Sequence, residues 1–378
     1  MILVVVCQSD SDSELSLNNR RLSAINKALA SQLQMNWNST LHDSHFRGII
    51  DRKYVANHKE SVYTDSEFQL MNFHNRQFYV KAAVKGTDSI IDWIVGEYEG
   101  EGKVARVFED TLRIGFTGDK QNNRERGLCT PFARNITGGR AIVLDIGANA
   151  GIYGFYATAL GCRTYFFDIQ EECQKWISST IDKNRFHHAA LIPYAVGNSS
   201  TTLKIPKQSN SCHGTFTISK TGDEYFTDAM KTSESAVVDM IRIDDLFTNA
   251  MSQGKLPHIA LIKIDVEGAE VGVLSGMKAL LKHVNPMTNR GTVRNVVCEV
   301  TPNRWAGLLS GGLSRDIVAE IFCDVLWDAG FQTITVFSNN NKQEKTKADL
   351  QVTSRTQLHK YIESGDFYSK DFYFKRYN

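Results

Sequence analysis

From Ala141 onward, short apolar segments alternate with longer amphipathic segments, and no other feature of the sequence constrains the fold as strongly. The run at 141–146 is apolar without interruption, which is typical of a strand buried on both faces. We expect strands at 141–146, 162–168, 190–197, 258–265, 293–300, 331–337 and 371–377, and helices at 150–161, 171–184, 270–284 and 314–330. Strands that alternate with helices predict an α/β fold in which right-handed crossovers connect a mostly parallel sheet.

Residues 1–140 lack this regularity, because they are mostly polar with scattered aromatic residues. Apolar residues at 90–95 favour one short helix that ends at the glycines that follow. We expect 1–140 to form an N-terminal extension packed on a domain made by 141–378. The apolar segment 1–7 is far shorter than the ~20 residues that span a bilayer, and it lacks the basic region and cleavage site of a signal peptide. It fits a buried strand or the stub of a trimmed anchor, and we expect no membrane span within this chain.

The charge balance excludes a general attraction to polyanions. The chain has 43 basic and 42 acidic residues and no long run of like charges, so neither nucleic acid nor an anionic membrane is expected as a partner. Its seven cysteines, an odd number, lack paired metal-ligand spacing and indicate a reduced, cytoplasmic protein. The N-x-S/T sequences at Asn38, Asn135 and Asn198 are compatible with a secretory route, but such short motifs are expected by chance.

The turn after the first strand of the sheet is a candidate ligand site. In an open parallel sheet the ligand lies at the carboxyl ends of the strands, which is where Asp145, Gly147, Asn149 and Gly151 occur. Gly147 lets the backbone approach a ligand, so a side chain there is expected to fill space that the ligand needs. Gly151 permits close packing of helix on strand. The same glycines also suit an ordinary strand-to-helix turn, so the turn alone does not separate a binding site from a structural connection.

Asp168 adds a second polar group to this edge of the sheet. It ends the second strand of the sheet 23 residues after Asp145, close to the ~20-residue offset at which an acid binds a ribose diol. An ordinary helix cap is the alternative. A dinucleotide fingerprint has glycine where this turn has Asn149, which would crowd a pyrophosphate. S-adenosylmethionine has no phosphate, and Asp145 could attract its ammonium group while amides near Gly147 meet its carboxylate.

Three carboxylates crowd the end of the strand at 258–265. Asp265, Glu267 and Glu270 lie within six residues, and Lys263 is the nearest counter-charge in the sequence. Such a group is costly to bury unless it is solvated or serves a function. Asp265 and Glu267 are therefore candidates for a catalytic base, an acceptor ligand or part of a metal site, although acids in the first turn of a helix are also favoured by its dipole.

Five motifs together resemble one family. They are DIGANAG at 145–151, AVGN at 195–198, MIRIDDL at 240–246, LIKIDVEGAEVGVLSGM at 261–277 and VVCEV at 296–300. In order and spacing the chain resembles the FkbM-type S-adenosylmethionine-dependent methyltransferases over roughly residues 140 to 300. The resemblance implies a Rossmann-like class I methyltransferase fold, with a seven-stranded, mostly parallel sheet whose last strand is antiparallel, and methyl transfer to a hydroxyl oxygen. Family members usually carry glutamate and proline after the second strand, whereas this chain has Asp168 and Ile169. The shorter acid is still expected to reach a ribose.

These observations predict an O-methyltransferase that acts on a sugar or another small hydroxylated acceptor. The expected cofactor residues are Asp145, Gly147, Asn149, Gly151, Asp168 and Ala195, the last from the AVGN motif. The candidate catalytic residues are Asp265, Glu267 and His213, the only histidine of the polar loop 209–216. No metal ligand is assigned. A nicotinamide-dependent oxidoreductase and a catalytically silent binding protein are the alternatives, and the oligomeric state stays open.

Overall fold

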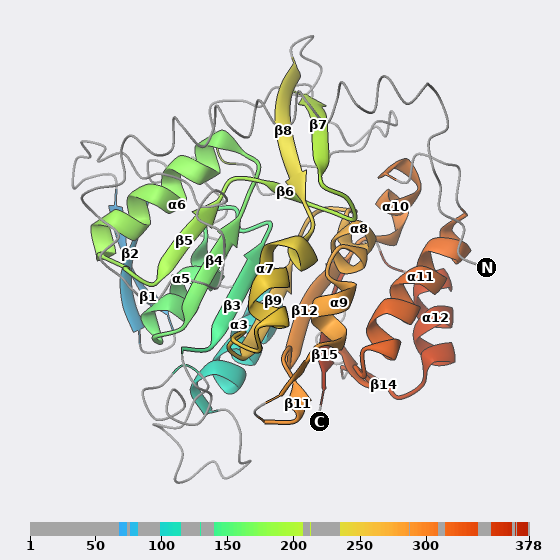
Figure 1. The fold of residues 1–378 in the computed structure, drawn as a ribbon. Coiled ribbons are helices and arrows are strands. Elements are labelled where there is room, and N and C mark those ends of the chain that lie inside the picture. Colours follow the sequence, from blue (N-terminus) through green and yellow to red (C-terminus); the bar gives the residue numbers. More distant parts are fainter. Residues whose placement is uncertain are drawn as a thin grey trace.

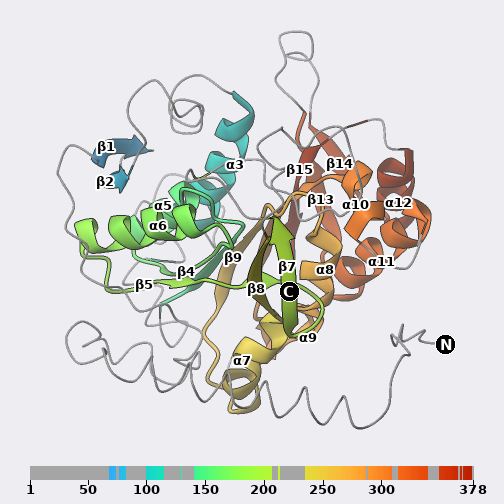
Figure 2. The same ribbon diagram turned by 90° about the horizontal axis from the view of Figure 1, so that it is seen from above.

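An eight-stranded sheet forms the centre of the molecule, with helices on both of its faces (Figures 1 and 2). The computed structural model describes residues 68–73, 76–81, 99–114, 129, 140–206, 212, 235–286, 288–308, 314–338, 349–364, 367 and 369–376. The strand order is β14-β13-β15-β12-β9-β3-β4-β5. The strands are β3 Ile142–Ile146, β4 Arg163–Phe167, β5 Ala189–Ile192, β9 Ile259–Ile264, β12 Asn295–Val300, β13 Thr333–Val336, β14 Leu350–Val352 and β15 Lys370–Lys375.

The direction of the strands follows the expected α/β pattern. The strands β5, β4, β3, β9 and β12 run parallel to one another, and β15 lies antiparallel between β12 and β13. These seven strands are those that the sequence predicts. The sheet differs by the short β14, which pairs antiparallel with β13 at the edge and was not expected.

The predicted strand at 190–197 divides into two. Its first half is β5, whereas β6 Ala195–Val196 belongs to a separate three-stranded sheet with β7 Thr201–Pro206 and β8 Ser235–Ile241. Pro193 lies between the halves, and proline has no N–H with which to continue a ladder. The chain therefore leaves the main sheet beside the carboxyl end of β4.

Alternate residues of β3 supply the two halves of the core. Ile142 and Leu144 pack with the helices of one face, and Val143 packs with those of the other. The first face carries α7 Ile243–Ser252, α8 Glu270–Ser275, α9 Lys278–Lys282, α10 Pro302–Leu308, α11 Arg315–Asp328 and α12 Arg355–Ser364. The second carries α5 Ile152–Ala159 and α6 Glu171–Asn184. Two-sided burial explains why the strand sequences are apolar without alternation.

The helix predicted at 270–284 is broken between α8 and α9. A side chain at Gly276 would overlap the backbone carbonyl of Gly197, so the helix approaches the turn after β6 more closely than other residues allow. Beyond the break, the buried Asp244 carboxylate accepts hydrogen bonds from the N–H groups of Ala279 and Leu280, at 3.0 and 2.8 Å. These contacts come from distant parts of the sequence, which is why periodicity alone predicts one continuous helix.

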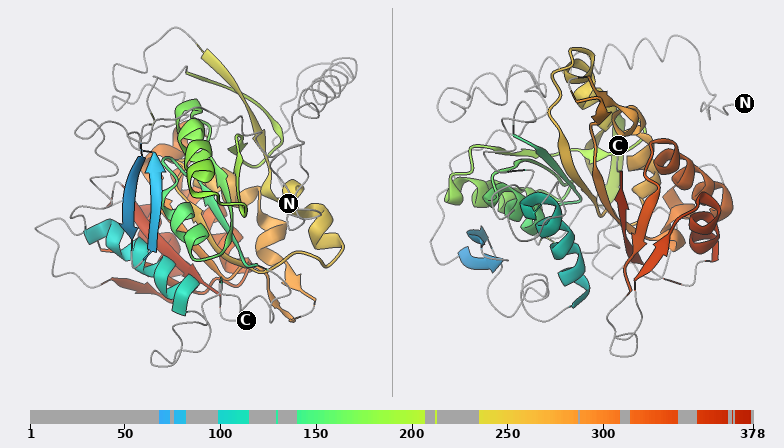
Figure 3. Two further views of the ribbon diagram at one scale, coloured as in Figure 1. Left: turned by 90° about the vertical axis from the view of Figure 1, so that its left-hand side faces the viewer. Right: turned by 90° about the horizontal axis from the view of Figure 1, so that it is seen from below.

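The described part of residues 1–140 lies against the second face of the sheet (Figure 3). A hairpin of β1 Phe68–Phe73 and β2 Arg76–Lys81 contacts α5 and α6, and α3 Glu99–Glu109 contacts α5. A π-helical turn, η4 Asp110–Ile114, continues α3. The helix expected at 90–95 lies outside the described residues, and the glycines 100 and 102 lie inside α3 instead of ending a helix.

Four cysteines form disulfides, so the prediction of a fully reduced chain is wrong for them. Cys129 pairs with Cys162, and Cys173 pairs with Cys212. The partners lie 33 and 39 residues apart, and spacing alone does not identify such pairs. Within the described part of the chain, no helix is both long and apolar enough to cross a bilayer.

Candidate functional site

A cleft that is open to solvent lies where β3, β4 and β9 end. Six of the predicted site residues line it: Gly147, Asn149, Asp168, Ala195, Asp265 and Glu267. Asp145 and Gly151 are not among its lining residues, and His213 lies outside the described residues. The apolar part of the lining comes mainly from Ile146, Phe167, Ile169, Tyr194 and Val196. Six of the nine candidate residues therefore lie together at one edge of the sheet, and their part in binding or catalysis stays a prediction.

Gly147 is required by the backbone around it. Its φ is 74°, and a side chain at this position would overlap the backbone carbonyl of Asp265. The N–H groups of Gly147 and Ala148 donate to the carbonyl of Phe167 at 2.9 and 3.0 Å. From the sequence, amides near Gly147 are expected to bind a ligand carboxylate, but these two N–H groups already donate to a backbone carbonyl. Gly147 allows the β3–α5 turn to lie directly against the chain that follows β9.

Asp145 supports the helix beside the cleft. Its side chain is buried beneath α5, where Oδ2 accepts a hydrogen bond from the N–H of Gly154 at 2.9 Å. Burial raises the pKa of Asp145 to about 6, although the Lys263 ammonium opposes the rise. The carboxylate does not reach the lining, so the predicted contact with a ligand ammonium has no support in this arrangement.

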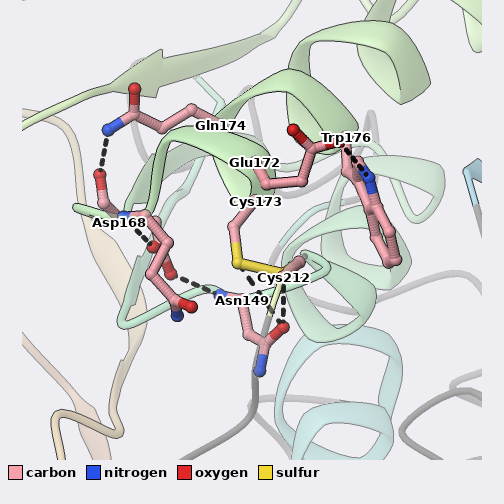
Figure 4. Close-up of a disulfide and its surroundings, with 8 residues drawn as sticks. Asn149, Asp168, Glu172, Cys173, Gln174, Trp176 and Cys212 are labelled. Atoms are coloured by element: carbon pink, nitrogen blue, oxygen red, sulfur yellow. Dashed lines mark hydrogen bonds between the residues drawn. A yellow bond between two sulfur atoms is a disulfide. The ribbon is translucent and has the colours of Figure 1, made fainter. Parts of the chain in front are cut away.

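Asp168 joins the turn after β3 to the end of β4. Its Oδ2 accepts a hydrogen bond from the N–H of Asn149 at 2.7 Å, and Oδ1 accepts one from the N–H of Gln170 at 2.8 Å (Figure 4). Gln170, not Asp168, is the residue that precedes the first turn of α6, so Asp168 is not the cap of that helix. Burial raises the pKa of Asp168 to about 7, although both backbone donors lower it. A carboxylate of this kind ionises close to neutral pH while it faces the cleft.

The acids after β9 separate into two groups. Asp265 and Glu267 face the cleft, whereas the fully buried Glu270 accepts hydrogen bonds from the Gly268 N–H, the Thr301 hydroxyl and the Trp305 indole N–H, at 2.7, 2.8 and 2.6 Å. Glu270 therefore holds the chain that follows β9 against the chain that follows β12. This structural role explains one of the three carboxylates that crowd the sequence.

Glu299 is an acid of the site that the sequence analysis does not identify. Cys298 of β12 pairs with Ile264 of β9, so the next residues, Glu299 and Asp265, lie side by side and share a hydrogen bond. Lys263 Nζ lies 2.9 Å from Asp265 Oδ2. In the sequence, only the occurrence of an acid inside the apolar run 296–300 pointed to Glu299. That it lies beside Asp265 depends on the register of two strands separated by 30 residues in the chain.

Burial and charge distribute one proton between these two acids. Burial pushes the pKa of Asp265 up, but Lys263 and the hydrogen bond with Glu299 outweigh it, so the pKa lies below its ordinary value. Burial and the Asp265 charge hold the pKa of Glu299 well above its ordinary value. Of the two acids, Asp265 therefore ionises more readily and Glu299 holds its proton more strongly.

The third acid of this group is balanced by a cation. Glu267, whose backbone is left-handed with φ at 51°, forms an ion pair with Arg304 of α10. Oxygen atoms of Asp265, Glu267 and Glu299 lie within 4.8 Å of one another, a separation that suits a cation. Because Lys263 and Arg304 already neutralise two of the carboxylates, these contacts do not assign a metal.

A profile of the methyltransferase FkbM domain matches residues 145–333, which is half of the chain and includes the whole cleft lining. The chain belongs to the FkbM methyltransferase family. S-adenosylmethionine is accordingly its cofactor. No curated protein matches the chain.

Solved structures give distant similarities. A SAM-dependent methyltransferase from Agrobacterium tumefaciens is 11% identical with a TM-score of 0.36, over 84% of this chain and 72% of the other. A putative SAM-dependent methyltransferase from Streptococcus mutans is 11% identical with a TM-score of 0.33, over 83% and 56%. A human methyltransferase 10 domain containing protein is 9% identical with a TM-score of 0.29, over 72% and 80%. These scores are too low to support an argument about function.

Proposed function

We propose that this FkbM methyltransferase transfers the methyl group to a hydroxyl oxygen of a sugar or another small acceptor. The main support for a cofactor site in the cleft is the Asp168 carboxylate, which is 6% exposed and faces the cleft. An ionised carboxylate has about four lone-pair positions. Backbone N–H groups use two of them here, so acceptor capacity remains for the two hydroxyls of a ribose.

The rest of the lining suits an adenosine without phosphates. Ile169, Tyr194 and Val196 supply apolar and aromatic surface beside Asp168, which fits a flat base. Among the described residues, no lysine or arginine lines the cleft, and the two N–H groups at the start of the turn are already bonded. A pyrophosphate would therefore find little compensation for its charge, which counts against a nicotinamide dinucleotide.

When bound, S-adenosylmethionine supplies an activated methyl group for in-line displacement by the acceptor oxygen. We place the acceptor hydroxyl at Asp265, which is ionised and can accept its hydrogen. The Lys263 ammonium and the hydrogen bond with Glu299 both lower the pKa of Asp265 and so favour its charged form. Glu267 is occupied by Arg304, so we assign it to acceptor positioning. His213 stays a second candidate for the base.

The test is turnover of Asp265→Asn with a panel of sugars, phenols, amines and carboxylic acids as acceptors. The change keeps the size of the side chain and removes its charge, so we expect kcat to fall by about 10² to 10⁴. The affinity for S-adenosylhomocysteine, measured by calorimetry, should change less than threefold. Asp328→Asn on the exposed end of α11 is the matched control and should turn over at the parent rate.

Three outcomes would contradict the proposal. Binding of NAD in place of S-adenosylhomocysteine would identify an oxidoreductase. Transfer to amines alone would exclude a hydroxyl acceptor. If Asp265→Asn and Glu267→Gln both keep the parent rate, the two acids have no catalytic part, and His213 becomes the base to test.

A further inference from the structure

The Cys173–Cys212 disulfide lies directly behind the polar residues of the cofactor cleft (Figure 4). Both cysteines are buried, with 0% and 2% of their surface exposed, and neither lines the cleft. Asn149 Oδ1 lies 2.8 Å from Cys212 Sγ and 3.8 Å from Cys173 Sγ. Disulfide sulfurs carry no proton, so the asparagine amide packs against the sulfur pair and can turn its NH₂ group toward it. The disulfide therefore fixes the space into which this side chain fits.

Asn149 connects that disulfide to the cleft. Its backbone is left-handed, with φ at 52°, and its N–H donates to Asp168 Oδ2 at 2.7 Å. A left-handed residue other than glycine costs free energy and persists only where its surroundings hold it. Here the Asp168 carboxylate holds the backbone, and the disulfide holds the side chain. A change at the sulfurs is thus transmitted to the cleft through one residue.

The first turn of α6 makes a second connection between the same groups. Cys173 lies in this turn, and the next residue, Gln174, donates through Nε2 to the Asp168 carbonyl at 2.8 Å. Gln170, just before the helix, donates its N–H to Asp168 Oδ1. The disulfide, the turn of α6, Asn149 and Asp168 therefore form one connected unit around the carboxylate.

We infer that the Cys173–Cys212 disulfide is a positioning element of the cofactor site, and that its reduction weakens cofactor binding. The inference rests on the proposed ribose contact of Asp168. Reduction by a dithiol breaks the S–S bond, adds two electrons and two protons to give two cysteine thiols, and converts the dithiol to its own disulfide. Two thiol sulfurs cannot remain at bonding distance, so they separate and the amide of Asn149 loses its fixed position.

The second disulfide provides a matched control within the same chain. Cys162 precedes the first residue of β4, whereas Asp168 follows the last, so Cys129–Cys162 lies at the opposite end of that strand from the cleft. Both of its cysteines are buried too. Loss of Cys129–Cys162 removes a cross-link of similar span without disturbing Asn149, which separates general destabilisation from an effect on the site.

The experiment measures the affinity of the full chain for S-adenosylhomocysteine by calorimetry. In Cys173→Ala/Cys212→Ala we expect at least a tenfold loss of affinity, and in Cys129→Ala/Cys162→Ala less than a threefold loss. Dithiothreitol should lower the affinity of Cys129→Ala/Cys162→Ala as the first pair of changes lowers that of the parent, in step with native-state titration of the two thiols of Cys173 and Cys212. If the first double variant fails to fold, this titration on the folded Cys129→Ala/Cys162→Ala variant still decides the question.

Asn149→Gly tests the connection itself, because glycine keeps the left-handed backbone and removes the amide. In the Asn149→Gly background, removal of Cys173–Cys212 should change the affinity less than threefold. Parent-like affinity of the folded Cys173→Ala/Cys212→Ala variant, or an equal loss in both disulfide variants, would overturn the inference while leaving the cofactor assignment intact. A parent protein that binds no S-adenosylhomocysteine would overturn the proposed function and this inference together.

Discussion

At the scale of single residues, Asp168 is buried and yet has to be ionised to bind the ribose hydroxyls as proposed. Burial raises its pKa to about 7, and hydroxyl donors bind the ionised form better. Below the pKa the group must lose a proton before it binds the ribose, so we expect the affinity for S-adenosylhomocysteine to fall as the pH is lowered through 7, by up to about tenfold per pH unit. Calorimetry between pH 5.5 and 8.5, in buffers of different ionisation enthalpy, measures both the slope and the proton released.

Asp168→Asn is the control for this pH dependence, because it keeps the shape of the side chain and cannot titrate. Its affinity should be lower at pH 8 and independent of pH across the same range. Asp168→Ala should lose about 1 to 3 kcal/mol of binding free energy. A parent profile that is flat from pH 5.5 to 8.5 would show that Asp168 is not the group that binds the ribose.

The residues of the site differ in how far the sequence predicts them. Asp168 and Asp265 each follow a buried apolar strand directly, so their place at the carboxyl edge of the sheet could be predicted. The orientation of Asp145 could not, because it depends on the N–H of Gly154 in the first turn of α5. Glu299 required the register between β9 and β12. The position of each acid on the sheet follows from its neighbours in sequence, whereas the partners of Asp145 and Glu299 depend on how other elements pack.

At the scale of elements, the turn between β3 and α5 packs against the turn that follows β9. A side chain at Gly147 would overlap the Asp265 carbonyl, and φ there is 74°. We expect Gly147→Ala to lower the free energy of unfolding by about 2 to 5 kcal/mol, because overpacking adds to the cost of a left-handed backbone. Urea unfolding monitored by circular dichroism measures this loss.

The matched control is Gly272→Ala in α8. A methyl group there meets no atom within 4 Å, and alanine favours a helix by up to about 1 kcal/mol over glycine. This variant should be as stable as the parent or slightly more so. Parent-like stability of Gly147→Ala combined with lost cofactor binding would restore the interpretation that Gly147 serves the ligand rather than the packing of two turns.

Elements were predicted well where their ends are set locally. The expected helix at 171–184 has the bounds of α6, since its periodicity and polar flanks lie in the helix itself. The helix at 270–284 and the strand at 190–197 were each predicted as one piece, and each is divided. The helix is broken where Gly276 packs against the backbone of Gly197, and the strand is divided at Pro193. The proline within 190–197 indicates a division of the strand, whereas nothing within 270–284 indicates the break in the helix.

At the scale of the whole molecule, the described residues before 140 are part of the core on the α5 face. The side chains of Phe78, Val80, Phe108 and Leu112 are buried in the same apolar cluster as Phe155 of α5. Polar contacts reinforce this packing. Asn184 of α6 exchanges two hydrogen bonds with the backbone of Tyr79, at 2.7 and 2.8 Å. We therefore propose that 1–140 is an extension that the domain at 141–378 needs in order to fold.

The chain shortened to residues 141–378 tests this dependence. Burial of each large apolar side chain contributes about 1.5 to 3 kcal/mol, so losing four partners removes as much free energy as the 5 to 15 kcal/mol that stabilises a typical domain. We expect the shortened chain to aggregate or to lack near-ultraviolet circular dichroism. Within the full chain, Phe108→Ala should cost about 3 to 5 kcal/mol, whereas Val237→Ala, at a side chain that is 68% exposed, should cost less than about 0.5 kcal/mol. If residues 141–378 instead unfold cooperatively and bind S-adenosylhomocysteine with parent affinity, the cleft is built by this part alone, and the extension has to be explained by what it contributes to the acceptor.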